Sequence, residues 1–416
     1  MNQLQIFLPC AAGVEDLLAA EVHELTGLMG QDLLTRRGGV MARASWRDAM
    51  LLNLHSRLAQ RVLVQLSYTD YRNEQDLYRA AADVAWEIWF TPKQSIKVEV
   101  TAQHSPLTSL NFAALKIKDA VCDRFRDRAH GVRPDVNTQW PDVRIYAHLT
   151  TDTCSLYIDT SGEPLFKRGW REDKGEAPLK ETLAAAMIAA SGWADGDDDL
   201  LPLYDPCCGS GTIAIEAAQI ACNIAPGSLR RFAFEKYIPF QQHVWDGIKQ
   251  EAAAAVVKPE PGQKPLIYGS DVAHRMVDFA QRNAERAGVA DVIEFRGGDA
   301  LQRMPPSDSP GVMLLNPPYG ERIAVAGVAA RELAVTEDGG EFFSQLATHW
   351  KKNYSGWTCW ILTPDLKLPS KMRLKESRRV PMWNGPIECR MFRFDMVKGA
   401  ARKNAGGQNG VGSPAA

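Results

Sequence analysis

The sequence predicts an α/β protein with a mostly parallel sheet in its second half and α+β units in its first half. From Leu179 onward, apolar strands alternate with helices at the spacing of β-α-β units. Before that point, strands and helices follow one another in two successive α+β patterns, over 1–60 and 61–175. The length of 416 residues allows two to three domains, at about 150 residues per domain.

The composition is that of an ordinary folded protein, with 45% apolar and 24% charged residues. The formal net charge is -2, so any nucleic-acid binding must come from a local basic surface. No stretch is long enough and apolar enough for a membrane span, and the first residues lack the basic region of a signal peptide. We therefore expect a cytoplasmic protein with no membrane partner. The eight cysteines have no CxxC or zinc-site spacing, so we expect reduced thiols and no metal site.

The first half is predicted from its apolar periodicity. In the first unit we expect strands at 4–8 and 39–44 and helices at 14–25 and 46–58. In the second unit we expect strands at 62–68 and 96–101, helices at 75–90 and 111–128, and a hairpin of 143–149 with 154–159. The Gly- and Asn-rich stretch 400–416 lacks apolar residues to pack, so we predict a disordered tail there.

Three segments carry basic residues that could contact RNA. The helix 111–128 alternates cations with aspartates, which also fits an ordinary solvated face. The segment 165–176, LFKRGWREDKGE, places Phe166 and Trp170 among cations. This pattern fits either a stacking platform for single-stranded RNA or a charged interdomain linker. The segment 367–403 has an excess of basic residues, which fits phosphate contact or a solvated strand face.

Four predicted strands of the second half end in loops of special residues. These are LLPLYDPCCGSG (200–211), PLIYGSD (265–271), VIEFRGGD (292–299) and GVMLLNPPYG (311–320). Ligands of open parallel sheets bind outside the carboxyl ends of the strands. We therefore expect these four loops to converge on one crevice.

The loop 205–212 predicts a site for an anionic or carboxylate-bearing ligand. Gly209 and Gly211 allow a tight turn and close backbone approach, and the following helix offers free amide groups. The stretch also fits the loose dinucleotide pattern GxGxxA, which is weak evidence alone. A NAD enzyme should have an acidic residue about 20 positions on, where this chain has Arg230. A NADP enzyme is a minor alternative.

Two aspartates follow the next strands. Asp271 can bind the two hydroxyls of a ribose, or it can cap the helix 273–287, since Asp is a favoured N-cap residue. Asp299 follows a Gly-Gly turn, where aspartate is common. Its expected place in the shared crevice makes it a candidate site residue.

The motif NPPYG at 316–320 is the most specific signal. A chance NPPY in a chain of this length is on the order of one in a thousand. The Asn316 side-chain oxygen and the Pro317 carbonyl can accept hydrogen bonds from a planar exocyclic amine. Pro318 adds rigidity to the bend, and Tyr319 can stack on the ring that carries the amine. The motif therefore predicts a clamp for the amino group of a base.

The motifs DPCCGSGT and NPPYG, in this order, resemble those of S-adenosylmethionine-dependent methyltransferases that act on base amines. This resemblance implies a Rossmann-like class I methyltransferase domain with S-adenosyl-L-methionine as cofactor. It further implies that Asp271 holds the ribose and Asp299 the adenine edge. The resemblance also implies that the methionine part of the cofactor is bound by Asp205, Pro206, Gly209, Ser210 and Gly211. It implies a catalytic clamp formed by Asn316, Pro317, Pro318 and Tyr319, with Asn316 also next to the cofactor.

Upstream, FAALKIKDAVCDRF, LYIDTSG, FKRGWR and APLKETLAAAM resemble a THUMP RNA-binding module and its junction. The chain as a whole is similar to the 23S rRNA guanine-N2 methyltransferase family. This implies a ferredoxin-like domain at 1–60, a THUMP domain at 61–175 and a methyltransferase domain at 176–399. The partner would be 23S rRNA or a ribosome assembly intermediate. Some relatives carry a second methyltransferase domain, and we expect that activity to be absent here.

Two alternative functions and the role of one insertion remain open. The substrate could be tRNA, because tRNA guanine-N2 methyltransferases of the THUMP class share these modules. A non-catalytic RNA-binding assembly factor is a further alternative, although intact Asp205, Asp271 and NPPY argue against it. The insertion 223–264 contains five aromatic residues. It could pack over the mouth of the site or serve as a purely structural cover. The sequence does not indicate an oligomeric state.

Overall fold

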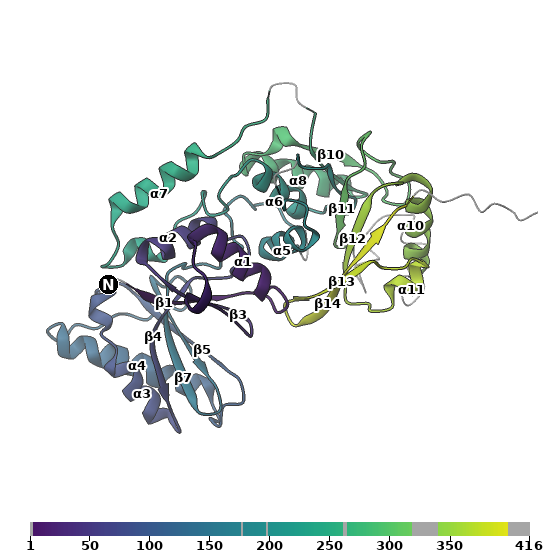
Figure 1. Cartoon of the computed structure of the whole chain (residues 1–416). Helices are drawn as coiled ribbons and strands as arrows, with labels where there is room; N and C mark the ends of the chain where they lie inside the picture. Colours follow the sequence, from purple (N-terminus) through teal and green to yellow (C-terminus); the bar gives the residue numbers. More distant parts are fainter. Residues whose placement is uncertain (1–2, 176–177, 197–198, 261–263, 318–339, 398–416) are drawn as a thin grey trace, which may run out of the picture.

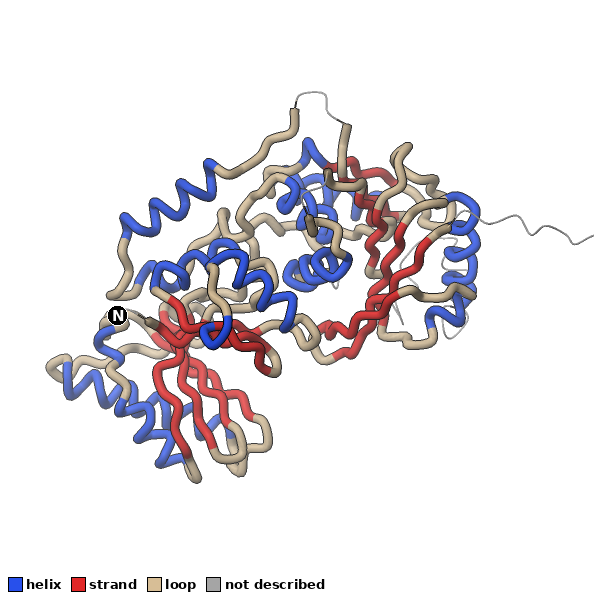
Figure 2. Tube along the Cα trace, viewed as in Figure 1, coloured by secondary structure: helices blue, strands red, loops and turns tan. Residues whose placement is uncertain are grey.

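The computed structural model describes residues 3–175, 178–196, 199–260, 264–317 and 340–397. Two seven-stranded sheets organise the molecule, one in each half of the chain. Figures 1 and 2 show the first sheet at the lower left and the second at the right, with helices between them. Within the described residues, no helix is long and apolar enough to cross a bilayer.

The first sheet combines strands from both N-terminal units. Its strands are β1 (Leu4–Pro9), β2 (Leu33–Arg36), β3 (Gly39–Ala44), β4 (Leu63–Asp70), β5 (Ile96–Ala102), β6 (Val143–Leu149) and β7 (Thr153–Asp159). They lie in the order β2-β3-β1-β4-β7-β6-β5. Strands β1 and β4 pair antiparallel, with Ile6 opposite Val64. The two units therefore share one continuous sheet.

Helices of the first half pack on this sheet. They are α1 (Glu15–Thr26), α2 (Trp46–His55), α3 (Glu74–Asp83) and α4 (Leu110–Arg128), with the short 3-10 helices η1 (Gly30–Asp32) and η2 (Trp86–Ile88). The helix predicted at 75–90 ends at Asp83, so its second half was wrong. The chain becomes extended at Val84 and then buries Trp86, whose indole Nε1 donates to the Ala81 carbonyl at 2.7 Å. Burial of this large ring overrides the helical pattern.

The second sheet contains the parallel strands that the sequence predicts. Its strands are β8 (Leu203–Asp205), β9 (Ile267–Asp271), β10 (Ile293–Gly297), β11 (Val312–Leu315), β12 (Thr358–Thr363), β13 (Arg378–Asn384) and β14 (Ile387–Asp395). Their order is β10-β9-β8-β11-β12-β14-β13. Strands β8 to β12 are parallel, whereas β14 is antiparallel to both β12 and β13. Strand order reverses between β8 and β11, which is the place where such sheets bind ligands.

Both faces of the second sheet are covered. Helices α5 (Glu181–Ser191), α6 (Thr212–Ala221) and α8 (His274–Arg286) lie on one face, with the 3-10 helix η4 (Ala290–Val292), and α10 (Gly340–Asn353) and α11 (Leu368–Met372) lie on the other (Figure 1). The first face belongs to a large core that continues into the N-terminal units. The second face forms a separate core, in which Phe342 and Trp350 pack on Met313 and Ile361.

The insertion between α6 and β9 packs on the N-terminal units. It carries η3 (Ala233–Lys236) and α7 (Gln242–Ala254), and Figure 1 shows α7 beside α2. Trp245 is buried against Phe234, and Phe234 meets Trp46 at a ring separation of 6.4 Å. The backbone amide of Ile238 donates to the Trp89 carbonyl at 2.9 Å. Of the two alternatives for this insertion, the structure selects the structural cover.

The segment LFKRGWREDKGE is an interdomain linker in which Trp170 and Arg168 turn inward, while Lys167 is exposed. Trp170 is fully buried, and the guanidinium of Arg168 is paired with Glu216 of α6 at 3.0 Å. The exposed fractions of these two charged side chains are 1% and 0%. The alternative of an RNA stacking platform is therefore wrong for Trp170 and Arg168.

Arg168→Met should destabilise the protein by about 3–5 kcal/mol, because it leaves the Glu216 carboxylate buried without its partner. Replacing both residues by methionine should restore part of the loss, since the Glu216 carboxylate is then no longer buried without its partner. Denaturant unfolding of the three proteins measures both effects. Lys167→Met is the matched control, because Lys167 forms an exposed pair with Glu163, and should cost less than about 1 kcal/mol. A double variant as unstable as Arg168→Met would contradict this account.

Candidate functional site

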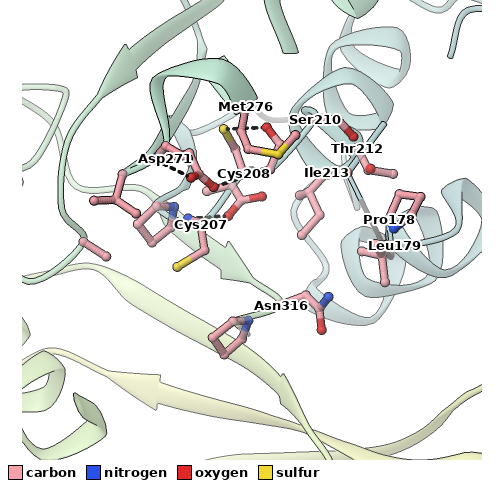
Figure 3. Close-up of a pocket in the computed structure, with 18 of the residues that line it drawn as sticks. Pro178, Leu179, Cys207, Cys208, Ser210, Thr212, Ile213, Asp271, Met276 and Asn316 are labelled. Atoms are coloured by element: carbon pink, nitrogen blue, oxygen red, sulfur yellow. Dashed lines mark hydrogen bonds between the residues drawn. The ribbon is translucent and has the colours of Figure 1, made fainter. Parts of the chain in front are cut away.

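A cavity of about 550 Å³ opens at the reversal of strand order in the second sheet. The loops after β8, β9, β10 and β11 all contribute to its lining, as the sequence predicts. The predicted site residues that it brings together are Asp205, Pro206, Gly209, Ser210, Asp271, Asp299, Asn316 and Pro317. Figure 3 shows Asn316 across the cavity from Asp271 and Met276.

The glycine loop connects β8 to α6 through backbone conformations that favour glycine. Gly209 and Gly211 have φ angles of 52° and 91°. Gly211 does not line the cavity; a Cβ there would stand 3.0 Å from the Cβ of Ala280 on α8. Helix α6 begins at Thr212, and its N-cap residue, Gly211, has no side chain that could cap the first amide groups. These amides remain available to an anionic group.

Asp205 ends β8 and is almost completely buried. Its Oδ1 accepts a hydrogen bond from the amide of Cys207 at 3.0 Å. Burial raises the pKa of the Asp205 carboxyl to about 8, and the nearby Asp271 adds to the increase. The carboxyl is therefore mostly protonated at neutral pH in the absence of a cation. A cationic group entering the cavity would favour its ionised form.

The two other aspartates also organise the loops that carry them. Asp271 accepts from the amide of Gly209 at 3.0 Å and from the amide of Ala273 at 2.9 Å. It therefore joins the end of β9 to the glycine loop. The N-cap of α8 is Ala273, without a side-chain cap, so Asp271 does not have the capping role that was its alternative. Asp299 accepts from the amide of Leu301 at 2.9 Å.

Asn316 presents a polar atom that has no hydrogen-bond partner among the described residues. It directly follows β11, and its Oδ1 is buried without a hydrogen bond in the described structure. A buried acceptor without a partner carries a desolvation cost, so it is a strong site for an incoming N–H donor. Pro317 also lines the cavity. The predicted clamp residues Pro318 and Tyr319 lie outside the described residues.

Apolar walls of the cavity were not predicted from the sequence. They include Leu179, Ile213, Met276, Phe279 and Phe342. Met276 belongs to the apolar stripe of α8, so that stripe was a usable signal. The linker also contributes Lys174, Gly175 and Pro178. No motif distinguishes these residues, because their place depends on how the linker folds back.

The cysteine pair in the glycine loop does not provide a nucleophile. Burial raises the pKa of the Cys207 and Cys208 thiols well above their usual range, and nearby aspartates add to the effect. A thiol attacks as its thiolate, which is disfavoured here.

The described part of the basic segment 367–403 consists mostly of β13 and β14, two strands of the second sheet. Arg390 pairs with Glu388 at 2.7 Å, and Arg393 pairs with Asp395 at 2.9 Å. The guanidinium of Arg379 lies over the ring of Phe392. These contacts favour the solvated strand face, while Arg378 and Lys375 remain exposed. Phosphate contact by this segment stays a prediction.

Comparison with known families agrees with this geometry. A model described as "RMKL-like, methyltransferase domain" matches residues 168–393, more than half of the chain. The chain belongs to the RMKL-like methyltransferase family. A THUMP domain model matches residues 71–159, and an RlmL ferredoxin-like domain model matches residues 5–63. The predicted fold class and domain order are confirmed, while the exact boundaries stay predictions.

Individual relatives extend this family assignment. Ribosomal RNA large subunit methyltransferase K/L of Psychromonas ingrahamii is 37% identical over 93% of this chain and 49% of its own length. The chain spans about half the length of the curated relatives it matches. The crystal structure of SMU.472 complexed with SAH superposes with a TM-score of 0.81 at 27% identity, over 95% of this chain and 98% of that chain. The crystal structure of a predicted N6-adenine-specific DNA methylase from Listeria monocytogenes superposes with a TM-score of 0.80 at 28% identity. The match covers 95% of this chain and 96% of that chain.

Asp205→Asn should remove a pH dependence of stability. The pKa of this carboxyl is about 8 in the folded protein, against about 4 in an unfolded chain. Between these values the folded state holds a proton that the unfolded state has lost. Stability therefore falls as pH rises, by up to about 1.4 kcal/mol per pH unit.

Melting temperatures of the wild type and Asp205→Asn, measured from pH 5 to pH 8, test this directly. The melting temperature of the variant should rise relative to that of the wild type as pH rises, because asparagine has no proton to lose. Asp271, whose pKa burial also raises, is present in both proteins. If the melting temperatures of the two proteins changed equally with pH over this range, Asp205 would not titrate as described.

Proposed function

We propose that the chain is an S-adenosylmethionine-dependent methyltransferase that modifies the exocyclic N2 amine of a guanine in 23S rRNA. The observation that carries the proposal is the unpartnered Oδ1 of Asn316 at the edge of the cavity. Membership of the methyltransferase family supports the reaction. The name of the curated relatives, ribosomal RNA large subunit methyltransferase K/L, supports the substrate. An enzyme acting on bacterial rRNA works in the cytoplasm.

The cavity residues fit this cofactor. The buried Asp205 carboxyl is suited to a cationic ammonium, and the amides at the start of α6 are suited to a carboxylate. Asp271 and Asp299 line the same cavity, and we assign Asp271 to the ribose hydroxyls and Asp299 to the adenine amine. Met276 and Phe279 provide apolar surface for a flat base. SMU.472, which shares the fold over nearly the full chain, was crystallised with SAH.

Bound S-adenosylmethionine supplies an electrophilic methyl group on a positively charged sulfur. The target guanine has to leave its helix, because a paired and stacked base cannot reach the cavity. Asn316 Oδ1 and the Pro317 carbonyl would accept hydrogen bonds from the two N–H groups of the N2 amine and hold its lone pair in line for transfer. The methyl–nitrogen bond would form as the methyl–sulfur bond breaks, and one amine proton would be released to solvent. We assign Tyr319 to stacking on the purine. Positioning and fixed dipoles supply most of the rate.

We propose separate roles for the three domains, with the boundaries proposed from the sequence. Residues 176–399 would carry the reaction, while 1–60 and 61–175 would deliver the RNA. The partner is 23S rRNA or an assembling ribosomal particle. The exposed cations of α4 and of the segment 367–397 are candidates for phosphate contact.

Asn316→Ala should lower methyl transfer by about a hundredfold to a thousandfold, because the variant loses an acceptor that orients the reacting amine. RNA affinity should be retained, since the N-terminal modules are untouched. Methyl transfer is measured from radiolabelled S-adenosylmethionine to protein-free 23S rRNA, and RNA affinity is measured by a filter-binding assay. Asn353→Ala on α10 is the matched control and should keep wild-type activity. Full activity of Asn316→Ala would defeat the clamp mechanism.

The same assay with bulk tRNA and assembly particles, followed by nucleoside analysis, fixes the substrate. N2-methylguanine in rRNA or in the particle alone agrees with the proposal. Label in tRNA would keep the chemistry and replace the substrate. A protein that binds S-adenosylmethionine but labels none of the three would overturn the substrate assignment, and one that fails to bind it would overturn the proposed function.

A further inference from the structure

Arg171 is the last basic residue of FKRGWR, and it reaches into the glycine loop. Its guanidinium donates from one terminal nitrogen to the Ser210 hydroxyl at 2.6 Å and from the other to the Thr212 hydroxyl at 2.5 Å. Its Nε donates to Glu181, the first residue of α5, at 2.7 Å. Ser210, Thr212 and Glu181 are all buried. The planar guanidinium of Arg171 therefore connects the linker to the glycine loop and to α5.

The linker follows α6 over two consecutive turns. Arg171 contacts Thr212, and Arg168 pairs with Glu216, four residues later on the same face of the helix. Trp170, fully buried between the two arginines, presents its ring to the Arg171 guanidinium at 4.9 Å. Arg168 also donates to the Arg57 carbonyl at 2.8 Å. The contact path thus runs from the first N-terminal unit to the glycine loop.

The other side of the glycine loop is held by α8. The Asn283 carboxamide donates to the Ser210 carbonyl at 3.0 Å and to the Asp173 carbonyl of the linker at 2.8 Å. Ser210 is therefore fixed through its carbonyl by α8 and through its hydroxyl by Arg171. Beyond Asp173, the linker continues as a wall of the same cavity through Lys174 and Gly175.

We propose that Arg171 is a positioning residue that holds Ser210 and Thr212 in the cofactor-binding geometry, so that cofactor affinity depends on the linker from the N-terminal modules. This rests on the proposed function, because it takes the cavity as the S-adenosylmethionine site. Arg171 itself does not line the cavity and acts through the two hydroxyls.

Arginine is needed here because three acceptors surround one side chain. A guanidinium presents donors in a rigid plane, whereas a lysine ammonium is a single point that cannot satisfy three separated oxygens. Arg171→Lys keeps the charge opposite Glu181 and loses the double contact with the loop. Thr212→Val removes one acceptor, with little change in side-chain volume, and leaves the Arg171–Glu181 pair in place.

The test uses the full chain and measures S-adenosylmethionine affinity by calorimetry, with KM and kcat for methyl transfer. Arg171→Lys should weaken cofactor binding about tenfold, and KM for the cofactor should rise in parallel. At saturating cofactor, kcat should stay within about twofold, because the clamp around Asn316 is unchanged. KM for RNA should also be unchanged. A general loss of structure would move all four quantities together.

A double-variant cycle identifies the route of the effect. Arg171→Lys should cost less in a Thr212→Val background than in the wild type, because the contact it removes is already lost. Arg230→Lys is the matched control. Arg230 also holds the linker, by donating to the carbonyls of Glu163, Pro164 and Lys167. This variant should leave cofactor affinity unchanged even where it lowers the melting temperature.

Each outcome of these experiments either supports or overturns the positioning role of Arg171. Wild-type affinity in both Arg171→Lys and Thr212→Val would overturn the positioning role while leaving the proposed function intact. Equal cofactor losses in Arg230→Lys and Arg171→Lys would show general loosening of the linker and would also overturn it. If Arg171→Lys does not fold, Thr212→Val carries the test, with weaker cofactor binding expected. A wild type that binds no S-adenosylmethionine overturns both proposals.

Discussion

The reversal of strand order between β8 and β11 is the constraint on which the site depends. At this point the connections leave to opposite faces of the sheet, so the two strand ends are not covered by a common helix. Asp205 ends β8 and Asn316 directly follows β11. A carboxyl suited to a cation and an amide oxygen suited to an amine therefore face one cavity. The rest of the fold supports these two strand ends, since α6 and α8 fix the loops on one side and α10 closes the other.

The convergence of the strand-end loops on one cavity could be predicted because the signals in those loops are local. Glycines at positive φ, an aspartate after an apolar strand and an Asn-Pro-Pro turn are each visible within a few residues. Because the carboxyl ends of parallel strands lie at the same edge of a sheet, these four loops can be placed at one crevice before any contact is known. The walls were not predictable in this way. Phe342 lies in α10, and its place in the cavity depends on packing across the sheet.

Non-local pairing also explains what sequence reasoning missed in the fold. The strand Leu33–Arg36 is short and mostly exposed, so it shows no alternation of buried and exposed residues, and it forms by pairing with β3. The union of the two N-terminal units rests on the β1–β4 pairing between distant segments. The 3-10 helix at Trp86 arises because the core accepts its ring. In each case the deciding partner is far away in sequence.

The linker shows why composition alone could not separate RNA contact from internal structure. Aromatic residues interleaved with arginines suit both, and the difference lies in the partners. Glu216 and Glu181 are buried carboxylates that would be costly without a cation. They fix Arg168 and Arg171 inside the protein, so these two cations are not available to phosphates. The two arginines instead connect the N-terminal units to the loop that carries Ser210, and any movement of the linker has to act on that loop.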